Sequence, residues 1–354
     1  MGCRVLKADQ FTDDKILCHP ERLSEWYING GTQPITYELD ITNVCTHHCP
    51  YCVGFYDKEG HRESLNIEEI KDIINQISGF CGKAVTFTGG GDPACNSALS
   101  ESVEYAKVKG LDVGIITNGS LLHRTNMELL VKNCSWIRVS LDAGGPAQYK
   151  RVHGMDEGEF KKVLMNISLL TEAKRAVFSD VTIGVGYLTP GPEEDMRECA
   201  LLCRDLGVDY VQFRPMLKLY DDTGGTPQDE SDIIQVIESI SEEFNHNGFQ
   251  VLCSKHKYEG LDKGRQYGRC YGHHFTAVIA ADKKLYLCCH LRGVEKYCLG
   301  DLKNNTLRDI WNSQHRKGIY VNLNLDDCPL FCRCDSFNKI LWNIKRKRKH
   351  INFL

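Results

Sequence analysis

Short runs of β-branched residues alternate with longer stretches of helical periodicity between Ile35 and Pro215. In each helical stretch the apolar residues recur every three or four positions, which is typical of amphipathic helices. The predicted strands are Ile35–Thr42, Ala84–Thr88, Asp112–Thr117, Trp136–Leu141, Asp180–Tyr187 and Asp209–Phe213. The predicted helices between them are Ile67–Ile77, Ala98–Lys109, Thr125–Lys132, Glu159–Ala173 and Glu193–Leu206.

Six strand–helix repeats in this order predict parallel strands joined by right-handed crossovers, which is an α/β fold. Six repeats are fewer than the eight that close a TIM barrel, so we expect a partial barrel of (β/α)6 type. In such sheets the chemistry lies at the carboxyl ends of the strands, in the loops that follow them.

The repeat ends after Pro215, and a different pattern follows. Residues 217–229 are turn-rich, and we expect a helix over Ser231–Asn247 and a short strand over Phe249–Cys253. Two alternating runs around Ala281-Asp-Lys-Lys284 predict a β-hairpin that brings Cys270 and Cys288 to the same end. We therefore expect an N-terminal extension over 1–34, a core over 35–215, a connecting segment over 216–254, and a small α+β domain over 255–354.

Composition agrees with a globular protein, with 42% apolar residues, 25% charged residues and a net charge of -4. No stretch approaches the roughly 20 apolar residues of a membrane span, and no signal peptide is visible. The 18 cysteines therefore indicate a reducing cytoplasm, where thiols bind metal or fill the core. The basic run from Lys345 to His350 could contact nucleic acid, but such runs at chain ends are usually only solvated.

The most informative motif is Cys45-Thr-His-His-Cys49-Pro-Tyr-Cys52, directly after the first predicted strand. A [4Fe–4S] cube binds one ligand on each iron, so three thiolates leave one iron open for a cofactor or substrate. A closed zinc site with His47 or His48 as the fourth ligand is the alternative.

This C-x3-C-x2-C motif resembles that of radical S-adenosylmethionine (radical SAM) enzymes, in which the amino and carboxylate groups of SAM chelate the open iron. After the second strand, Gly89-Gly90-Gly91-Asp92 resembles the GGE motif that holds the SAM amino group, with Asp92 at its acidic position. The resemblance further implies SAM contacts from later strand ends and from the cysteine loop, namely Asn118, Ser140, Arg151, Gly186, Tyr187 and Tyr51. Two close glycines in a strand, Gly184 and Gly186, also indicate that something approaches the strand there.

A second set of cysteines resembles the SPASM/twitch extension of radical SAM enzymes. The resemblance rests on a Cys, a hairpin, a Cys, the segment Leu299-Gly-Asp-Leu…Ile310-Trp-Asn-Ser and a closing group of cysteines. It implies one auxiliary [4Fe–4S] cluster in the shorter twitch form, with ligands Cys270, Cys288, Cys328 and Cys332, and with Cys334 as the alternate for the last place. A structural zinc site made by the same residues is the alternative.

The resemblance implies reductive cleavage of SAM to a 5′-deoxyadenosyl radical, followed by removal of a hydrogen atom from the substrate. The substrate radical then either loses an electron to the auxiliary cluster, which is dehydrogenation, or regains hydrogen from a thiol, which is epimerisation. Cys289 is the candidate donor, with Cys253 and Cys298 as alternatives, although core packing also accounts for all three.

We expect a small polar substrate such as a sugar, an aminocyclitol or a nucleotide-like molecule. Peptide-modifying relatives commonly carry an N-terminal leader-binding domain, for which 34 residues before the first strand are too few. A peptide or protein maturase is the alternative, and a non-catalytic iron–sulfur sensor or nucleic-acid-binding protein is a remote one. Ile351-Asn-Phe-Leu354 lacks the paired glycines of molybdopterin-type cyclases, so we expect a different reaction. A flavodoxin or ferredoxin is the expected electron donor, and no membrane partner is expected.

Overall fold

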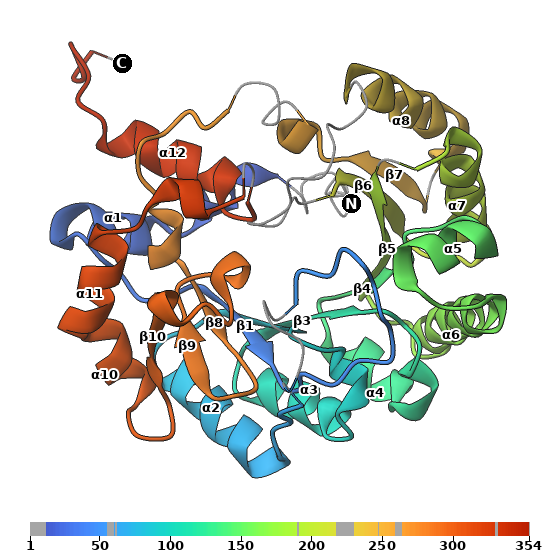
Figure 1. The fold of residues 1–354 in the computed structure, drawn as a ribbon, viewed down its shortest axis with the longest axis horizontal. Coiled ribbons are helices and arrows are strands. Elements are labelled where there is room, and N and C mark those ends of the chain that lie inside the picture. Colours follow the sequence, from blue (N-terminus) through green and yellow to red (C-terminus); the bar gives the residue numbers. More distant parts are fainter. Residues whose placement is uncertain are drawn as a thin grey trace.

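A computed structural model describes residues 12–54, 60, 62–189, 191–216, 230–246, 248–258, 264–329 and 332–353. One twisted sheet with strand order β10-β9-β8-β1-β2-β3-β4-β5-β6-β7 runs through both parts of the chain. Figure 1 shows this sheet curving into an open ring, with helices along its outer side. The predicted turn-rich connection over 217–229 lies outside the described residues.

The barrel strands agree closely with the predicted ones. They are β1 (Thr36–Asp40), β2 (Ala84–Thr88), β3 (Asp112–Thr117), β4 (Trp136–Ser140), β5 (Thr182–Thr189), β6 (Tyr210–Pro215) and β7 (Gln250–Cys253), each parallel to the next. The partial α/β barrel is therefore confirmed. The strand predicted over Phe249–Cys253 belongs to this sheet as a seventh parallel strand, because β7 pairs with β6.

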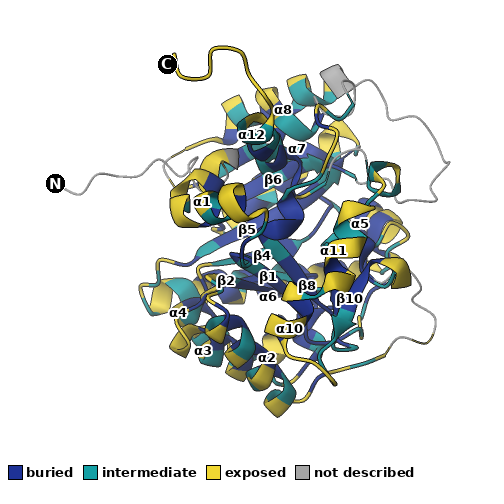
Figure 2. Cartoon of the chain, turned by 90° about the vertical axis from the view of Figure 1, so that its left-hand side faces the viewer, coloured by how far each residue is buried: buried dark blue, intermediate teal, exposed yellow. Residues whose placement is uncertain are grey.

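The helices on the outer face are α2 (Ile67–Gly79), α3 (Leu99–Val108), α4 (Met127–Asn133), α5 (Pro146–His153), α6 (Glu157–Ala176), α7 (Glu193–Asp205) and α8 (Glu230–Phe244). In α2, Asn66 and Glu69 form a capping box, and Ile70 and Ile77 are fully buried against the sheet. Figure 2 shows the same arrangement throughout, with buried strands in the centre and exposed outer helix faces.

The C-terminal part continues the sheet on its other edge. Strand β8 (Thr276–Ile279) pairs in parallel with β1, and β9 (Lys284–Tyr286) and β10 (Cys298–Asp301) follow in antiparallel register. The predicted hairpin is therefore present, and its turn contains Lys283 at φ 67°. Helices α10 (Leu307–Asn312), α11 (Gln314–Val321) and α12 (Asp335–Lys345) cover this part together with the N-terminal α1 (Pro20–Asn29).

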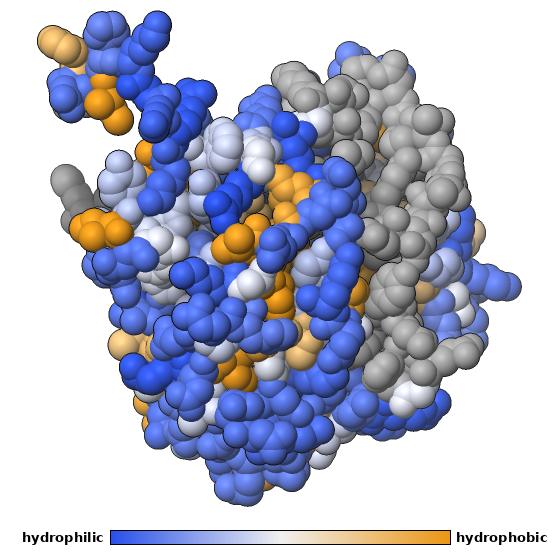
Figure 3. All heavy atoms as spheres, turned by 60° about the vertical axis from the view of Figure 1, so that its left-hand side comes forward, coloured by the Kyte–Doolittle hydropathy of each residue, from blue (hydrophilic) through white to orange (hydrophobic). Residues whose placement is uncertain are grey.

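Polar residues dominate the outer surface on the side of the C-terminal helices, and hydrophobic residues gather in a strip near its middle (Figure 3). None of the helices in the described ranges is both long and apolar enough to cross a membrane.

Candidate active site

The three cysteines of the first motif lie in the loop that leaves the carboxyl end of β1. The Sγ of Cys45 accepts the His47 N–H at 3.4 Å, and that of Cys52 accepts the Gly54 N–H at 3.3 Å. Such donors favour the thiolate over the thiol, because they stabilise the negative charge on sulfur. The loop therefore presents three sulfurs that can serve as ligands of an iron–sulfur cluster.

Cys49 has a different partner, which the sequence did not indicate. Its Sγ lies 3.1 Å from Nδ1 of His153, at the end of α5. The other ring nitrogen, Nε2, is 3.0 Å from the Leu141 carbonyl oxygen and must therefore carry a proton. In the neutral ring Nδ1 is then an acceptor, so His153 is placed to take the thiol proton when Cys49 becomes a ligand.

His47 is engaged elsewhere and does not fit the role of a zinc ligand. Its Nε2 lies 2.6 Å from the Tyr149 hydroxyl, and its Nδ1 lies 3.0 Å from the Asn118 amide nitrogen. Burial lowers the pKa of the ring to about 4, so it is neutral at physiological pH. Within the described ranges, no three His, Cys, Asp or Glu side chains gather closely enough to hold a single metal ion.

The glycine run after β2 fits tightly against the start of the cysteine loop. Gly91 donates to the Thr42 carbonyl at 3.0 Å, and an added Cβ there would lie 2.2 Å from the Val44 carbonyl oxygen. Gly89 has φ 145°, and its Cβ would lie 2.6 Å from the Asp40 carboxyl group. Glycine is therefore required at both positions by close approach, and Gly90 lies between them at the same strand end.

The Asp92 carboxylate has several partners within the protein. Its carboxylate accepts hydrogen bonds from the Asn118 N–H at 2.6 Å, from the Thr117 hydroxyl at 2.9 Å and from the Ala94 N–H at 2.9 Å. The side chain is only 4% exposed, and burial raises its pKa. Asp92 thus holds the glycine loop against the end of β3, and direct contact with SAM stays a prediction.

Tyr187 is placed differently from expectation, whereas the roles of Arg151, Tyr51, Ser140 and Asn118 stay predictions. The Tyr187 side chain is buried and its hydroxyl donates to Asp195 of α7 at 2.7 Å, so it lies on the helix side of β5 and not inside the barrel. Arg151 is exposed on α5. Tyr51 is 48% exposed beside Cys52, whereas Ser140 and Asn118 lie at the ends of β4 and β3 as expected.

The two glycines of β5 make room for side chains of the neighbouring strands. A Cβ on Gly184 would lie 2.0 Å from the Tyr210 ring, whereas a Cβ on Gly186 would lie 3.6 Å from Arg214 Nη2 and 3.8 Å from Arg138 Cδ. A close approach to this strand is thus present at Gly184, whereas at Gly186 the neighbours lie at ordinary contact distance and the predicted approach of a ligand stays a prediction. Sequence reasoning missed these two arginines, although the period of two in β4 and β6 places them on the inner face with Ser140 and Gln212.

The second cysteine set converges on one pocket beside β8. Its lining includes the four predicted ligands, Cys270, Cys288, Cys328 and Cys332. Cys289 and Cys334 line it as well. Burial and the neighbouring thiols raise the pKa of Cys270 to about 12 and that of Cys328 to about 11. A hydrogen bond with Cys334 lowers the pKa of Cys332. Six cysteines that line one pocket fit an iron–sulfur cluster, which would bind four of the sulfurs as thiolates.

The candidate hydrogen donors occupy different places. Cys289 lies in the auxiliary pocket next to Cys288. Cys298 packs with Ala280 and Tyr286 in a small cluster of its own, which fits core packing. Cys253 ends β7, opposite Phe213 of β6.

A buried ion-pair network joins β1 to the auxiliary pocket. Arg292 lies 2.6 Å from Asp40 and 2.9 Å from Glu38, both of which face the inside of the barrel. Arg333, between Cys332 and Cys334, pairs with Glu38 as well. The strand that carries the first cysteine motif is thereby tied to the loop of the second.

Comparison with known proteins identifies both parts of the chain. The Radical SAM superfamily matches residues 39–202, and the iron–sulfur cluster-binding SPASM domain matches residues 270–335. The chain belongs to the radical SAM superfamily. Its cofactors are accordingly a [4Fe–4S] cluster with SAM and auxiliary iron–sulfur chemistry in the SPASM domain.

Individual relatives are distant. A GTP 3′,8-cyclase of Alkaliphilus oremlandii is 27% identical over 50% of this chain, and the match spans 56% of the cyclase, about half its length. An AdoMet-dependent heme synthase of Methanosarcina barkeri is 22% identical over 77% of this chain and 81% of its own. The crystal structure of Streptococcus suis SuiB bound to the precursor peptide SuiA has a TM-score of 0.67 at 14% identity, over 86% of this chain and 71% of SuiB. At that identity the likeness shows the fold alone.

Proposed function

We propose that this protein is a radical SAM oxidoreductase that removes a hydrogen atom from a small polar substrate, giving dehydrogenation or epimerisation. A sugar, an aminocyclitol or a nucleotide-like molecule is the proposed substrate class. The observation that carries the proposal is the three-thiol loop at the end of β1, in which Cys45, Cys49 and Cys52 each have a hydrogen-bond partner and lie beside a close-fitting glycine loop.

In this proposal Cys45, Cys49 and Cys52 hold the cluster, and His153 accepts the Cys49 proton as the ligand forms. When bound, the cluster and SAM supply a 5′-deoxyadenosyl radical that takes the substrate hydrogen. The backbone of Gly89, Gly90 and Gly91 and the side chains of Asn118 and Ser140 would orient SAM at the strand ends. Gly186 would leave space beside it, and Arg151 and Tyr51 would close over it from the exposed side.

The auxiliary pocket would provide the outlet for dehydrogenation. Cys270, Cys288, Cys328 and Cys332 are the proposed ligands, with Cys334 as the alternate. In the epimerisation route Cys289 would return hydrogen from its S–H group. Burial raises the pKa of Cys289 and keeps it protonated, which a hydrogen-atom donor requires.

The names of the curated relatives favour a small molecule, because they refer to GTP and heme. A peptide or protein maturase is the second candidate, supported by the fold that this chain shares with a structure bound to a precursor peptide. A non-catalytic iron–sulfur sensor or nucleic-acid-binding protein is a remote third. It would not need a glycine loop built for close approach at the end of β2.

The test is SAM cleavage by anaerobically reconstituted protein. We expect 5′-deoxyadenosine from the wild type, its loss in Cys49→Ala, and its retention in Cys18→Ala, which removes an exposed cysteine far along the chain from either motif. Iron and sulfide counts of about eight per chain would support two clusters, and counts of about four would refute the auxiliary cluster. SAM cleavage by Cys49→Ala at the wild-type rate would refute the proposed function.

A further inference from the structure

Two arginines face the inside of the barrel from either side of β5. Arg138 of β4 pairs in register with Gly184, and Arg214 of β6 pairs with Leu188. Both side chains extend toward Gly186, where a methyl group would lie 3.6 Å from Arg214 Nη2 and 3.8 Å from Arg138 Cδ. The two cationic side chains thus lie on either side of Gly186 on the inner face of the sheet, and Ser140 pairs in register with Gly186.

Neither guanidinium forms a salt bridge with a residue that the structure describes. Arg138 has one hydrogen bond, at 3.5 Å to Gln212 Oε1, and the Nε atoms of both arginines are buried without a partner there. Asp142 acts on Arg214 electrostatically, but its carboxylate accepts the Leu188 N–H at 2.8 Å and lies 3.5 Å from His153.

The contrast with another arginine of the same barrel is informative. Arg292 is buried, more so than the partly exposed Arg138 and Arg214, and it lies between two carboxylates, Asp40 and Glu38. Buried charges in proteins are normally paired in this way, because an unpaired buried charge is costly. Burial and the charge of Arg138 lower the pKa of Arg214 to about 10, so it remains a cation at neutral pH. Arg138 and Arg214 are therefore two positive charges without a paired anion among the described residues.

We propose that Arg138 and Arg214 form an anion subsite for a carboxylate or phosphate group of the substrate. The inference rests on the proposed function and narrows it from polar substrates to anionic ones. Arginine suits this task, because its planar fork donates two parallel hydrogen bonds to an oxyanion. Gln212 and Ser140 lie on the same inner face and can donate to the neutral part of such a molecule.

SAM also carries a carboxylate that could bind these arginines. The test therefore distinguishes a subsite for SAM from a subsite for the substrate. Binding of inorganic phosphate and of pyrophosphate to the reconstituted full-length protein is measured by calorimetry, with and without saturating SAM. We expect binding of at least one of the two that persists when SAM is bound. Phosphate binding that SAM abolishes would assign the arginines to SAM and overturn the substrate subsite. No binding of either ion by the wild type would overturn it as well.

Variants then locate the binding. Arg138→Gln and Arg214→Gln each remove charge-assisted hydrogen bonds and should weaken phosphate binding at least about tenfold. The control Arg175→Gln changes an exposed arginine of α6 and should leave binding unchanged. Unchanged binding in both inner variants would show an adventitious ion only and overturn the proposal.

Arg138→Lys and Arg214→Lys keep the charge and serve if the Gln variants fail to fold. Each should bind phosphate more weakly than the wild type, because lysine lacks the fork. Wild-type affinity in both Lys variants would contradict the proposal. SAM cleavage by the wild type, measured on the same preparation, tests the proposed function separately, because phosphate binding does not require turnover.

Discussion

At the scale of single residues, His274 shows how burial sets a dependence on pH. His274 is 3% exposed, its ring centroid lies 4.0 Å from that of the tilted His273 ring, and the cations Arg316, Arg269 and Lys345 lie near it. Burial, and then these charges, lower its pKa to about 3, whereas an unfolded histidine titrates near about 6.5. The unfolded chain therefore takes up a proton first as the pH falls.

We predict that this residue makes the folded state less stable in mild acid. Its contribution is constant above about pH 6.5, falls as the pH drops, and stops changing below about pH 3. From about pH 7 to about pH 5 the loss amounts to about 2 kcal/mol. His274→Phe keeps the ring and removes the titration, so urea unfolding of the cluster-free variant should show a smaller loss than wild type. Equal losses in both proteins would contradict the assignment.

The chemistry of single residues was predictable where spacing alone decides it. Three cysteines within eight residues must share one loop, and the structure adds only their partners. The role of Asp92 and the direction of Tyr187 were not predictable in this way. A shift of one residue in a strand moves a side chain to the opposite face, and two partners of Asp92, Thr117 and Asn118, come from the end of β3, about 25 residues away.

At the scale of elements, most barrel strands begin and end within two residues of their predicted bounds, because β-branched runs bounded by turn residues are a strong local signal. Helices α1, α5 and α11 were not predicted, because each is short and buries few apolar residues, although the Pro at the start of α1 and of α5 is itself a helix-start signal. The pairing of β8 with β1 was not predictable either. It joins segments about 240 residues apart, and nothing local specifies it.

The glycines of β5 give a prediction that belongs to this scale. Gly184→Ala would place a methyl group 2.0 Å from the buried Tyr210 ring, so the ring must move. Overpacking of this kind costs about 1–3 kcal/mol. Gly186→Ala, two residues along the same face, makes only ordinary contacts at 3.6 and 3.8 Å and should cost less. Chemical unfolding of the two variants measures the difference, and equal costs would show that the ring adapts freely.

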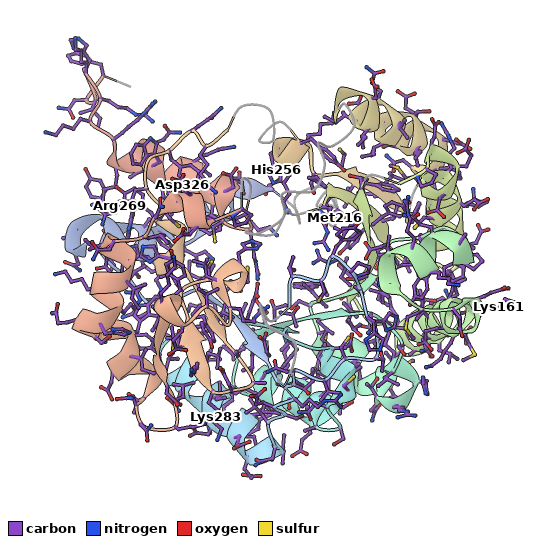
Figure 4. All side chains as sticks on the ribbon, viewed as in Figure 1. Lys161, Met216, His256, Arg269, Lys283 and Asp326 are labelled. Atoms are coloured by element: carbon purple, nitrogen blue, oxygen red, sulfur yellow. The ribbon has the colours of Figure 1, made fainter. Side chains whose placement is uncertain are left out.

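At the scale of the whole molecule, the sheet and the ion pairs join the two parts of the chain. Strand β8 of the SPASM part pairs with β1 over four residue pairs, from Thr36 with Thr276 to Leu39 with Ile279. Arg292 of the same part is buried between Glu38 and Asp40 of β1. In Figure 4, Met216 and His256 lie on the inner side of the open ring, whereas Lys161 and Lys283 lie on its outside. The inner wall is therefore built from both parts.

We predict that the cluster-free chain unfolds in one transition, because neither part keeps its sheet edge and ion pairs without the other. Fluorescence of Trp136 in β4 and of Trp311 in α10, recorded in variants that retain one of them, should report the same urea midpoint. Arg292→Met leaves Asp40 buried without its charged partner, while Glu38 keeps Arg333, and should cost about 3–5 kcal/mol. Lys284→Met removes a more exposed pair with Glu295 and should cost less than about 1 kcal/mol. Separate midpoints for Trp136 and Trp311 would mean that the barrel folds without the SPASM part. The pairing of β8 with β1 would then be a contact between two independently folding parts and not a common core.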